Sequence, residues 1–363
     1  MTGRLLMCLG TRVFQVNKFQ PASGLGHIFF WYENWRLAAR VRSRMLAAGF
    51  VEYPLGDERV HCFLCDDFET CLPVLSSFLD EKEKRQISVL MAESARPDLF
   101  DFGRLRSVEF HETQLLARWL GDMLIDRRYR SLMQPIVCAK NRADVMGYEF
   151  LMRGLHTDGT DISAPSLFNT AEQCGMSYAL DLAAGESATR TAKINNIKTD
   201  VFVNVLPHTI GNEAGFDAWL QAVLVKCEIP PEQIVFELVE SQQLASVEAL
   251  RKVVDKLHAQ GVRVAMDDFG SGFNNLIGLV EAVPDFIKLD KSLVNDLKRD
   301  KRKWNLIANL VDSAKDSDIE VIAEGVEDMD TADILTRLGV DYLQGYYIGF
   351  PKDKPLDQIL IAV

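Results

Sequence analysis

The chain has 363 residues, of which 48% are hydrophobic and 25% are charged, a composition that excludes disorder, collagen and a small stapled scaffold. No apolar run approaches the roughly 18 residues of a membrane span. The seven cysteines are odd in number and scattered, so we expect reduced thiols, a cytoplasmic location and no membrane partner. The net charge of -12 arises wholly in residues 121–363, where 37 acidic side chains outnumber 25 basic ones. Such a domain is a poor partner for duplex nucleic acid and is suited to holding cations.

The first 110 residues alternate strand and helix patterns. Strands are predicted over 27–32, 50–53, 59–65 and 87–91, and helices over 34–48 and 67–81. The resulting order, βαββαβ, is that of a ferredoxin-like sandwich, so we predict a smaller α+β regulatory or sensory domain over 1–110. Residues 111–130 are predicted to form a connecting helix.

From residue 131 onward, eight short apolar runs alternate with helical patterns. They cover 132–138, 145–152, 201–206, 234–239, 262–266, 286–289, 321–323 and 342–348. Eight strands in about 230 residues match a (β/α)8 barrel, so the α/β fold class predicted for 131–363 is a TIM-like barrel. Only residues 139–144 join the first two runs. This connection is too short for a crossover helix and predicts an antiparallel first strand pair.

Polar side chains stand late in these strands, where the carboxyl ends of a barrel converge on one face and build the active site. They are Glu149, Asn204, Glu237, Asp267, Asp268, Lys288, Asp290, Glu324 and Gln344. Any one of them has an ordinary explanation as a helix cap or turn residue. Their recurrence on successive strands favours a shared site.

The five strand-end acids Glu149, Glu237, Asp267, Asp268 and Glu324 would repel one another on one face unless cations neutralised them. Oxygen ligands favour hard ions such as Mg²⁺ or Mn²⁺. Two such ions, about 3.5 to 4 Å apart, are a standard means of cleaving a phosphodiester. The adjacent Asp267 and Asp268 fit a bridging arrangement, although an Asp pair alone is also a common turn and cap.

A series of short motifs runs from residue 132 to residue 351. They read Gln134-Pro135-Ile136-Val137, Glu149-Phe150-Leu151-Met152-Arg153, Val203-Asn204, Phe236-Glu237-Leu238-Val239-Glu240-Ser241, Met266-Asp267-Asp268-Phe269-Gly270-Ser271-Gly272, Phe286-Ile287-Lys288-Leu289-Asp290, Ala323-Glu324-Gly325-Val326-Glu327, and Gln344-Gly345-Tyr346-Tyr347 with Pro351. In this order they resemble the EAL-domain phosphodiesterases, which hydrolyse cyclic di-GMP. The second motif is similar to that family's Glu-x-Leu-x-Arg signature, and the fifth to its Asp-Asp-Phe-Gly loop.

The resemblance implies a site for two Mg²⁺ or Mn²⁺ ions. The first ion would be bound by Glu149, Asn204, Glu237 and Asp267. The second would be bound or positioned by Asp267, Asp268 and Glu324. Asp267 would therefore bridge the pair.

The resemblance also implies catalytic and substrate-binding residues. Lys288 would stabilise or deprotonate the attacking water, and Lys288, Glu324 and a hydroxide on the ions all remain candidates for the base. Glu149 counts with Lys288 and Glu324 as catalytic. The implied substrate contacts are Gln134, Leu151, Arg153 and Gln344. The planar guanidinium of Arg153 suits phosphate oxygens. Gln344 would also help to fix the water or a metal shell. Glu240 would steady the loop after Asp268.

Two segments depart from the family pattern. Phe150 stands where a small residue is usual, and Phe273-Asn274-Asn275 replaces a Tyr-Ser-Ser sequence in the loop after the Asp pair. That loop resembles the one that couples dimerisation to activity in the family. The resemblance therefore implies a homodimer, and the departures bear on the basal activity.

The leading hypothesis is a metal-dependent phosphodiesterase that linearises cyclic di-GMP to pGpG and is regulated by its N-terminal domain, whose own ligand or partner the sequence does not name. The alternative is a non-catalytic cyclic di-GMP receptor that signals to a protein partner. A purely structural module is a third reading, but clustered charges at a barrel mouth are destabilising unless a ligand or metal compensates them.

Four residues of the N-terminal domain, His61, Cys62, Cys65 and Cys71, suggest a zinc site. Cys62 and Cys65 lie on a predicted strand, where residues three apart face opposite sides. Buried thiols are therefore favoured over a metal site.

Overall fold

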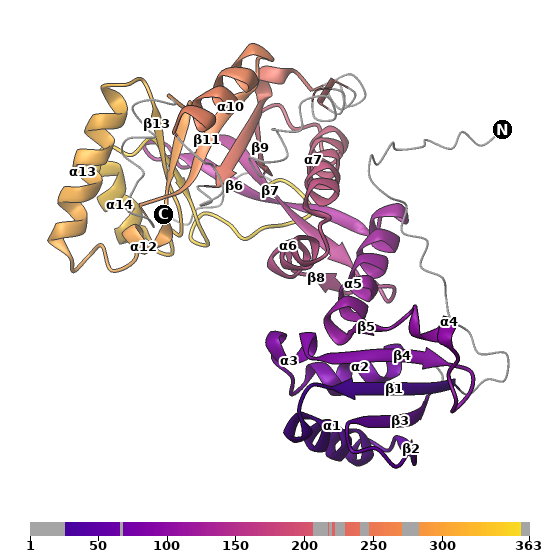
Figure 1. Ribbon diagram of the computed structural model, residues 1–363. Coiled ribbons are helices and arrows are strands. Elements are labelled where there is room, and N and C mark those ends of the chain that lie inside the picture. The colour runs from indigo at the N-terminus through magenta and orange to yellow at the C-terminus, as the bar shows by residue number, and fades with distance from the viewer. Residues whose placement is uncertain are drawn as a thin grey trace, which may run out of the picture. The chain divides into compact units, whose positions relative to one another are not determined.

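The computed structural model describes residues 26–65, 68–205, 217, 220–221, 229–239, 247–270 and 283–356. The chain divides into two compact units, Met1–Trp119 and Leu120–Val363. Helix α5 (Val108–Ile125) carries the boundary between them (Figure 1).

The first unit is an antiparallel sheet with helices. Its elements are β1 (Gly26–Tyr32), α1 (Trp35–Ala47), β2 (Val51–Tyr53), β3 (Val60–Cys65), α2 (Phe68–Ser76), α3 (Glu81–Arg85), β4 (Ile87–Ala92), α4 (Leu99–Phe102), β5 (Arg106–Ser107) and the first part of α5. The strand order is β2-β3-β1-β4-β5, and every neighbouring pair is antiparallel. The first four strands therefore have the predicted ferredoxin-like order, which is confirmed, and the short β5 extends one edge.

Local sequence explains the helices of this unit. Asn34 caps α1 by accepting a hydrogen bond from the Leu37 amide at 2.9 Å, and the apolar residues of α1 pack against the β1 face that carries Ile28 and Phe30. The single helix predicted over 67–81 is wrong, because two helices form. Asp80 and Glu83 build a capping box that starts α3 after α2 has ended.

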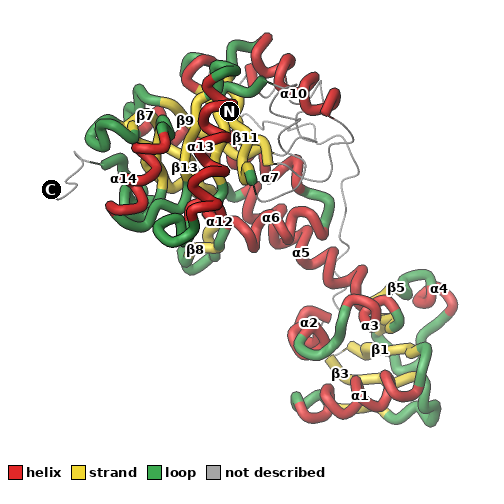
Figure 2. The backbone as a smooth tube through the Cα atoms, turned by 90° about the vertical axis from the view of Figure 1, so that its left-hand side faces the viewer, coloured by secondary structure: helices red, strands yellow, loops and turns green. Residues whose placement is uncertain are grey.

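The second unit is a barrel. Its elements are the last part of α5, then β6 (Tyr129–Cys138), β7 (Val145–Leu155), β8 (Asp161–Ile162), α6 (Ala164–Gln173), α7 (Ser177–Ile194), β9 (Asp200–Val205), η1 (Pro231–Gln233), β10 (Ile234–Val239), α10 (Val247–Ala259), β11 (Arg263–Phe269), β12 (Phe286–Leu289), α12 (Lys291–Val294), α13 (Lys301–Lys315), β13 (Glu320–Ala323), α14 (Met329–Leu338) and β14 (Tyr342–Gln344). In Figure 2, helices such as α13 and α14 lie outside the strands.

The strands close into a ring. The order is β6-β14-β13-β12-β11-β10-β9-β7, with β8 paired beyond β7, and β6 also pairs with β7. Strand β6 is antiparallel to both of its neighbours, and the other pairs of the ring are parallel. The predicted TIM-like barrel with an antiparallel first strand pair is confirmed.

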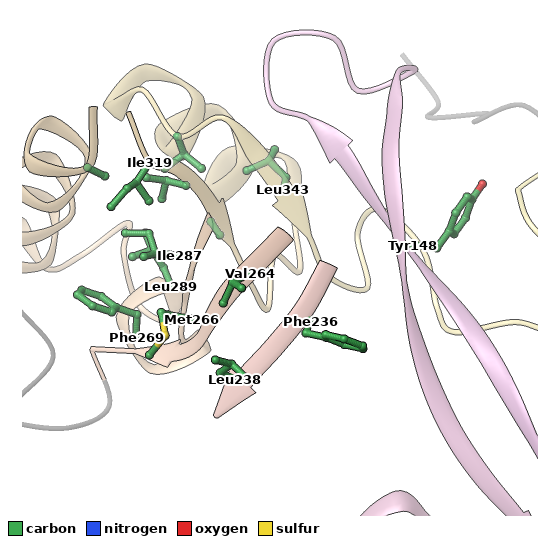
Figure 3. Close-up of a cluster of buried hydrophobic side chains, with 14 of the residues drawn as sticks. Tyr148, Phe236, Leu238, Val264, Met266, Phe269, Ile287, Leu289, Ile319 and Leu343 are labelled. Carbon is green, nitrogen blue, oxygen red and sulfur yellow. The ribbon is translucent and has the colours of Figure 1, made fainter. Parts of the chain in front are cut away.

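Strand alternation gives this barrel two apolar layers. The inner layer consists of one residue from each of six strands, namely Ile136, Phe202, Val235, Ala265, Phe286 and Ile322. The residues next to them in sequence, such as Phe236 and Val264, belong to the larger cluster shared with the surrounding helices (Figure 3). Because side chains alternate along a strand, residues two positions from the inner layer also point into the barrel.

Candidate active site

A polar layer lies directly above the inner apolar layer. Asn204, Glu237, Asp267, Lys288 and Glu324 each come two residues after an inner-layer residue on the same strand or its extension. At the carboxyl end of parallel strands, this spacing turns them into the mouth of the barrel. Gln134 comes two residues before Ile136 instead, since β6 runs in the opposite direction.

Lys288 lies at the centre of this layer, with an exposure of 1%. Its Nζ atom is 2.6 Å from Glu324 Oε1 and 2.7 Å from Glu237 Oε1. It is also 3.3 Å from Asp267 Oδ1 and 3.6 Å from Glu149 Oε2. Side chains that are up to 175 positions apart in the chain thus meet at one ammonium group.

Amide side chains fix both oxygens of Glu149. Gln344 Nε2 donates to Glu149 Oε2 at 2.6 Å, and Asn204 Nδ2 donates to Glu149 Oε1 at 3.0 Å. Gln344 Nε2 also approaches Gln134 Oε1 at 3.5 Å, and Gln134 Nε2 donates to the Gly349 carbonyl at 3.3 Å. Two predicted substrate residues, Gln134 and Gln344, therefore lie beside the predicted metal ligands.

Burial and mutual charge shift the ionisation of these groups. Burial and the Glu149 carboxylate hold the pKa of Glu237 well above its usual range. Burial raises the pKa of Glu324 to about 7, and burial also raises that of Asp268. For Glu149, burial acts to raise the pKa, but Lys288 and the amide donors outweigh it and lower the pKa. For Lys288, burial acts to lower the pKa, but the surrounding carboxylates hold it well above its ordinary value.

The Asp267-Asp268 pair sits on an irregularity of β11. The pairing of β11 with β12 shifts register between Met266 and Phe269, and Asp268 has a φ of 55°. Consecutive strand residues would point to opposite faces, whereas a bulge re-aims one of them, and Asp is among the residues that tolerate a left-handed backbone. Carboxylate oxygens of Asp267, Asp268 and Glu324 accordingly lie within 4.8 Å of one another.

The arrangement fits divalent cations. The donor atoms are oxygens, which hard ions prefer. The buried Oε1 of Gln344 accepts no hydrogen bond from the described residues. Four carboxylates, those of Glu149, Glu237, Asp267 and Glu324, contact the Lys288 ammonium, and the carboxylate of Asp268 lies within 4.8 Å of those of Asp267 and Glu324. Full ionisation would leave four negative charges there, which is the charge that two divalent ions balance.

A cavity of about 640 Å³ adjoins Glu149. Its walls come from residues 149–153 on β7, residues 203–205 on β9, and helices α6 and α7. Leu151 and Arg153, both predicted as substrate contacts, line this cavity. Arg153 donates one hydrogen bond, from Nη1 to the Met152 carbonyl at 2.8 Å.

Asp181 also lines this cavity but was not among the predicted residues. It is 1% exposed on α7 and follows the buried Leu180. An acidic residue on the buried face of a helix is unusual, because burying a charge is unfavourable without a partner. That mismatch is the signal by which the sequence could have revealed it.

Two of the predictions concern residues outside the described part of the chain. Glu240 and the segment Phe273-Asn274-Asn275 lie outside the described residues.

In the N-terminal unit, Cys62 belongs to a different buried cluster from Cys65 and Cys71. This separation agrees with the strand alternation from which buried thiols were favoured over zinc.

The fold and its mouth define a TIM-like barrel with an acidic cluster around a buried lysine. A family model described as the EAL domain matches residues 117–351. The chain therefore belongs to the EAL domain family, and the resemblance found in the sequence is confirmed. Within the described residues, no helix is both long and apolar enough to cross a membrane.

Relatives and solved structures agree with this assignment. The "Probable cyclic di-GMP phosphodiesterase PdeA" of Escherichia coli K12 is 29% identical over 291 residues, which are 78% of this chain and 38% of PdeA. The cyclic di-GMP phosphodiesterase PdeL of the same organism is 27% identical over 231 residues, 63% of this chain and 64% of PdeL. The structure of the PaMucR phosphodiesterase in complex with c-di-GMP has a TM-score of 0.59 and 25% identity, covering 66% of this chain and 97% of PaMucR. The chain thus spans less than two thirds of the length of either curated relative.

Proposed function

We propose that this protein hydrolyses cyclic di-GMP to linear pGpG with the help of two Mg²⁺ or Mn²⁺ ions at the barrel mouth. The observation that carries the proposal is the convergence of four carboxylates on Lys288 within 3.6 Å. A cluster of this kind is unfavourable without cations. Membership of the EAL domain family and the names of PdeA and PdeL support the choice of substrate.

Two groups of ligands would hold the ions. The first comprises Glu149, Asn204, Glu237 and Asp267, and the second comprises Asp267, Asp268 and Glu324. When bound, the ions would activate a water molecule and neutralise charge on the phosphoryl oxygens. The bulge at Asp268 supports the place of Asp267 in both groups of ligands, because it allows Asp267 and Asp268 to face the barrel mouth together.

The remaining residues would bind and orient the reactants. The Lys288 ammonium has three N–H donors and would orient the attacking water beside the scissile phosphate. The Arg153 guanidinium, at the cavity wall, would hold phosphate oxygens. Within the cavity, the carboxylate of Asp181 would accept hydrogen bonds from the N–H groups of a guanine base.

Turnover of cyclic di-GMP by the purified chain tests the proposal. The product pGpG is followed chromatographically with Mg²⁺, with Mn²⁺ and with EDTA. Asp267→Asn should abolish product formation, because the carboxylate that belongs to both proposed groups of ligands is lost. Asp312→Asn, the same change on the exposed face of α13, should leave it intact.

The same experiment distinguishes the rival function. Binding of cyclic di-GMP without any product, whichever metal is present, would overturn hydrolysis and favour a receptor. If the chain neither binds cyclic di-GMP nor forms product, the assignment of the substrate is overturned as well.

The proposal also includes regulation by the N-terminal unit and assembly into a dimer. The N-terminal unit would regulate a homodimeric enzyme in the cytoplasm, and α5, which runs from one unit into the other, is the covalent route for such control. Sedimentation of the full chain, with and without cyclic di-GMP, measures the oligomeric state. A monomer under both conditions would refute the dimer.

A further inference from the structure

Two cysteines of the N-terminal unit contact each other. Cys65 ends β3 and Cys71 lies in α2, and their Sγ atoms are 3.4 Å apart. Both side chains are buried, with exposures of 5% and 0%. Two thiols in contact, six positions apart, need only a short movement to reach the S–S bond length of about 2.05 Å.

The contact is specific to this pair. Cys62 lies on the same strand but belongs to the buried cluster that contains Phe29 and Leu90. Cys65 and Cys71 belong to the cluster that α1 and α2 cover. Cys62 is therefore a matched internal control, a buried thiol in the same strand whose cluster is separate from that of the pair.

Helix α2 offers a route by which an oxidant can reach these buried sulfurs. It has nine residues and contains Pro73 in its interior. Proline has no N–H and clashes with the preceding turn. A helix of this length is marginal by itself, so local opening of α2 would expose Cys71 without unfolding of the whole unit.

We propose that Cys65 and Cys71 are a site of reversible oxidation, at which a peroxide converts them to an intramolecular disulfide. One thiol is first oxidised to a sulfenic acid, and the peroxide is reduced to water when hydrogen peroxide is the oxidant. The second thiol then attacks that sulfur, so the S–S bond forms and a second water leaves. In total the two thiols lose two electrons and two protons.

The bond would fix α2 to the end of β3. Helix α2 already contacts α5, because Ser76 Oγ donates to Glu112 Oε1 at 2.8 Å and Arg118 pairs with Glu69. Oxidation should therefore restrict the opening of α2 while its contacts with α5 persist. Slower amide hydrogen exchange in α2 is the expected physical consequence.

The test uses the full chain, reduced and then treated with hydrogen peroxide. Peptide mapping without reductant should show a Cys65–Cys71 linkage, the intact mass should fall by two hydrogen atoms, and dithiothreitol should reverse both changes. Cys62→Ser should retain the linkage, whereas Cys65→Ser and Cys71→Ser should each lose it.

Other outcomes overturn the proposal. Linkage through Cys62 in its place, or oxidation of either sulfur to sulfinic acid without a disulfide, excludes a functional pair. The mapping of the unsubstituted protein decides the matter even where a serine variant fails to fold. Because no step of this test depends on turnover, its result is independent of the proposed hydrolysis.

Discussion

Replacement of Lys288 by Met tests how the barrel mouth is stabilised. The substitution keeps most of the side-chain length but removes the one ammonium that four carboxylates share. Lys288 is 1% exposed and Glu237 is 0% exposed, so solvent screens their interaction little. Removing one partner of a buried ion pair typically costs about 3–5 kcal/mol. For a unit of this size, that loss lowers Tm by about 6 to 20 °C.

The cost should depend on metal. In EDTA at about pH 8, carboxyl groups with ordinary pKa values are ionised, and the Lys288→Met variant should show the full loss of stability. In excess Mn²⁺ the deficit should shrink by on the order of 1–4 kcal/mol, because the variant lacks an ammonium that repels a divalent ion a few ångströms away. Ions that bind only the folded state would raise its stability. Thermal unfolding under both conditions, with turnover measured in parallel, gives the comparison.

A surface lysine provides the matched control. Lys298 also contacts two acidic groups, at 2.8 Å from Asp328 Oδ1 and 3.3 Å from Asp330 Oδ2, but its side chain is 42% exposed. Water screens such pairs, so Lys298→Met should change Tm little with or without Mn²⁺. An equal deficit for Lys288→Met in EDTA and in Mn²⁺ would refute cation binding by this cluster. No deficit in either would refute the ion-pair account itself.

Three further predictions concern packing, pH and substrate binding. Gly345→Ala should destabilise the barrel by about 1–3 kcal/mol in chemical denaturation, because a Cβ there would lie 2.2 Å from the Val326 carbonyl oxygen; a neutral effect would contradict this close approach. Burial lowers the pKa values of His61 and His111 below 6.5, so protonation of these two side chains favours the unfolded state and the N-terminal unit should lose stability as the pH drops from about 7.5 to about 5.5. Replacing both histidines with Gln should reduce that loss of Tm, and an unchanged pH profile would exclude them. Asp181→Asn should raise KM for cyclic di-GMP about tenfold, the loss of one charge-assisted hydrogen bond, with a smaller change in kcat; an unchanged KM would remove Asp181 from the binding site.

Sequence patterns predicted the barrel well because its two signals are local. Apolar runs mark the strands, and a polar residue late in each run marks the mouth, as Asn204 does in the run over 201–206. The six residues from 139 to 144 suffice to exclude a crossover helix between β6 and β7, and those strands are indeed antiparallel. Neither inference needs knowledge of what packs against the strand.

Other features depend on contacts between distant segments. The two-residue strand β5 is too short to show the alternation of apolar and polar residues that marks a strand, and it forms through pairing with β4. The inward direction of both Asp267 and Asp268 follows from the register shift opposite β12, which a single strand's sequence does not encode. The position of Asp181 in the cavity wall depends on where α7 packs, and the four-way contact of Lys288 exists only once the ring of strands has closed.

The same alternation that builds the core also determines the geometry of the site. The rings of Phe202 and Phe286 pack inside the barrel with their centroids 5.5 Å apart. Each ring lies two residues before a polar residue of the mouth, Asn204 on β9 and Lys288 on β12. Because interiors are close-packed and resist changes of volume, the separation of these strands is set by the rings below the site. The distances among the polar side chains are therefore a consequence of core packing, so a change of volume in that apolar layer should alter these distances and, with them, the proposed hydrolysis.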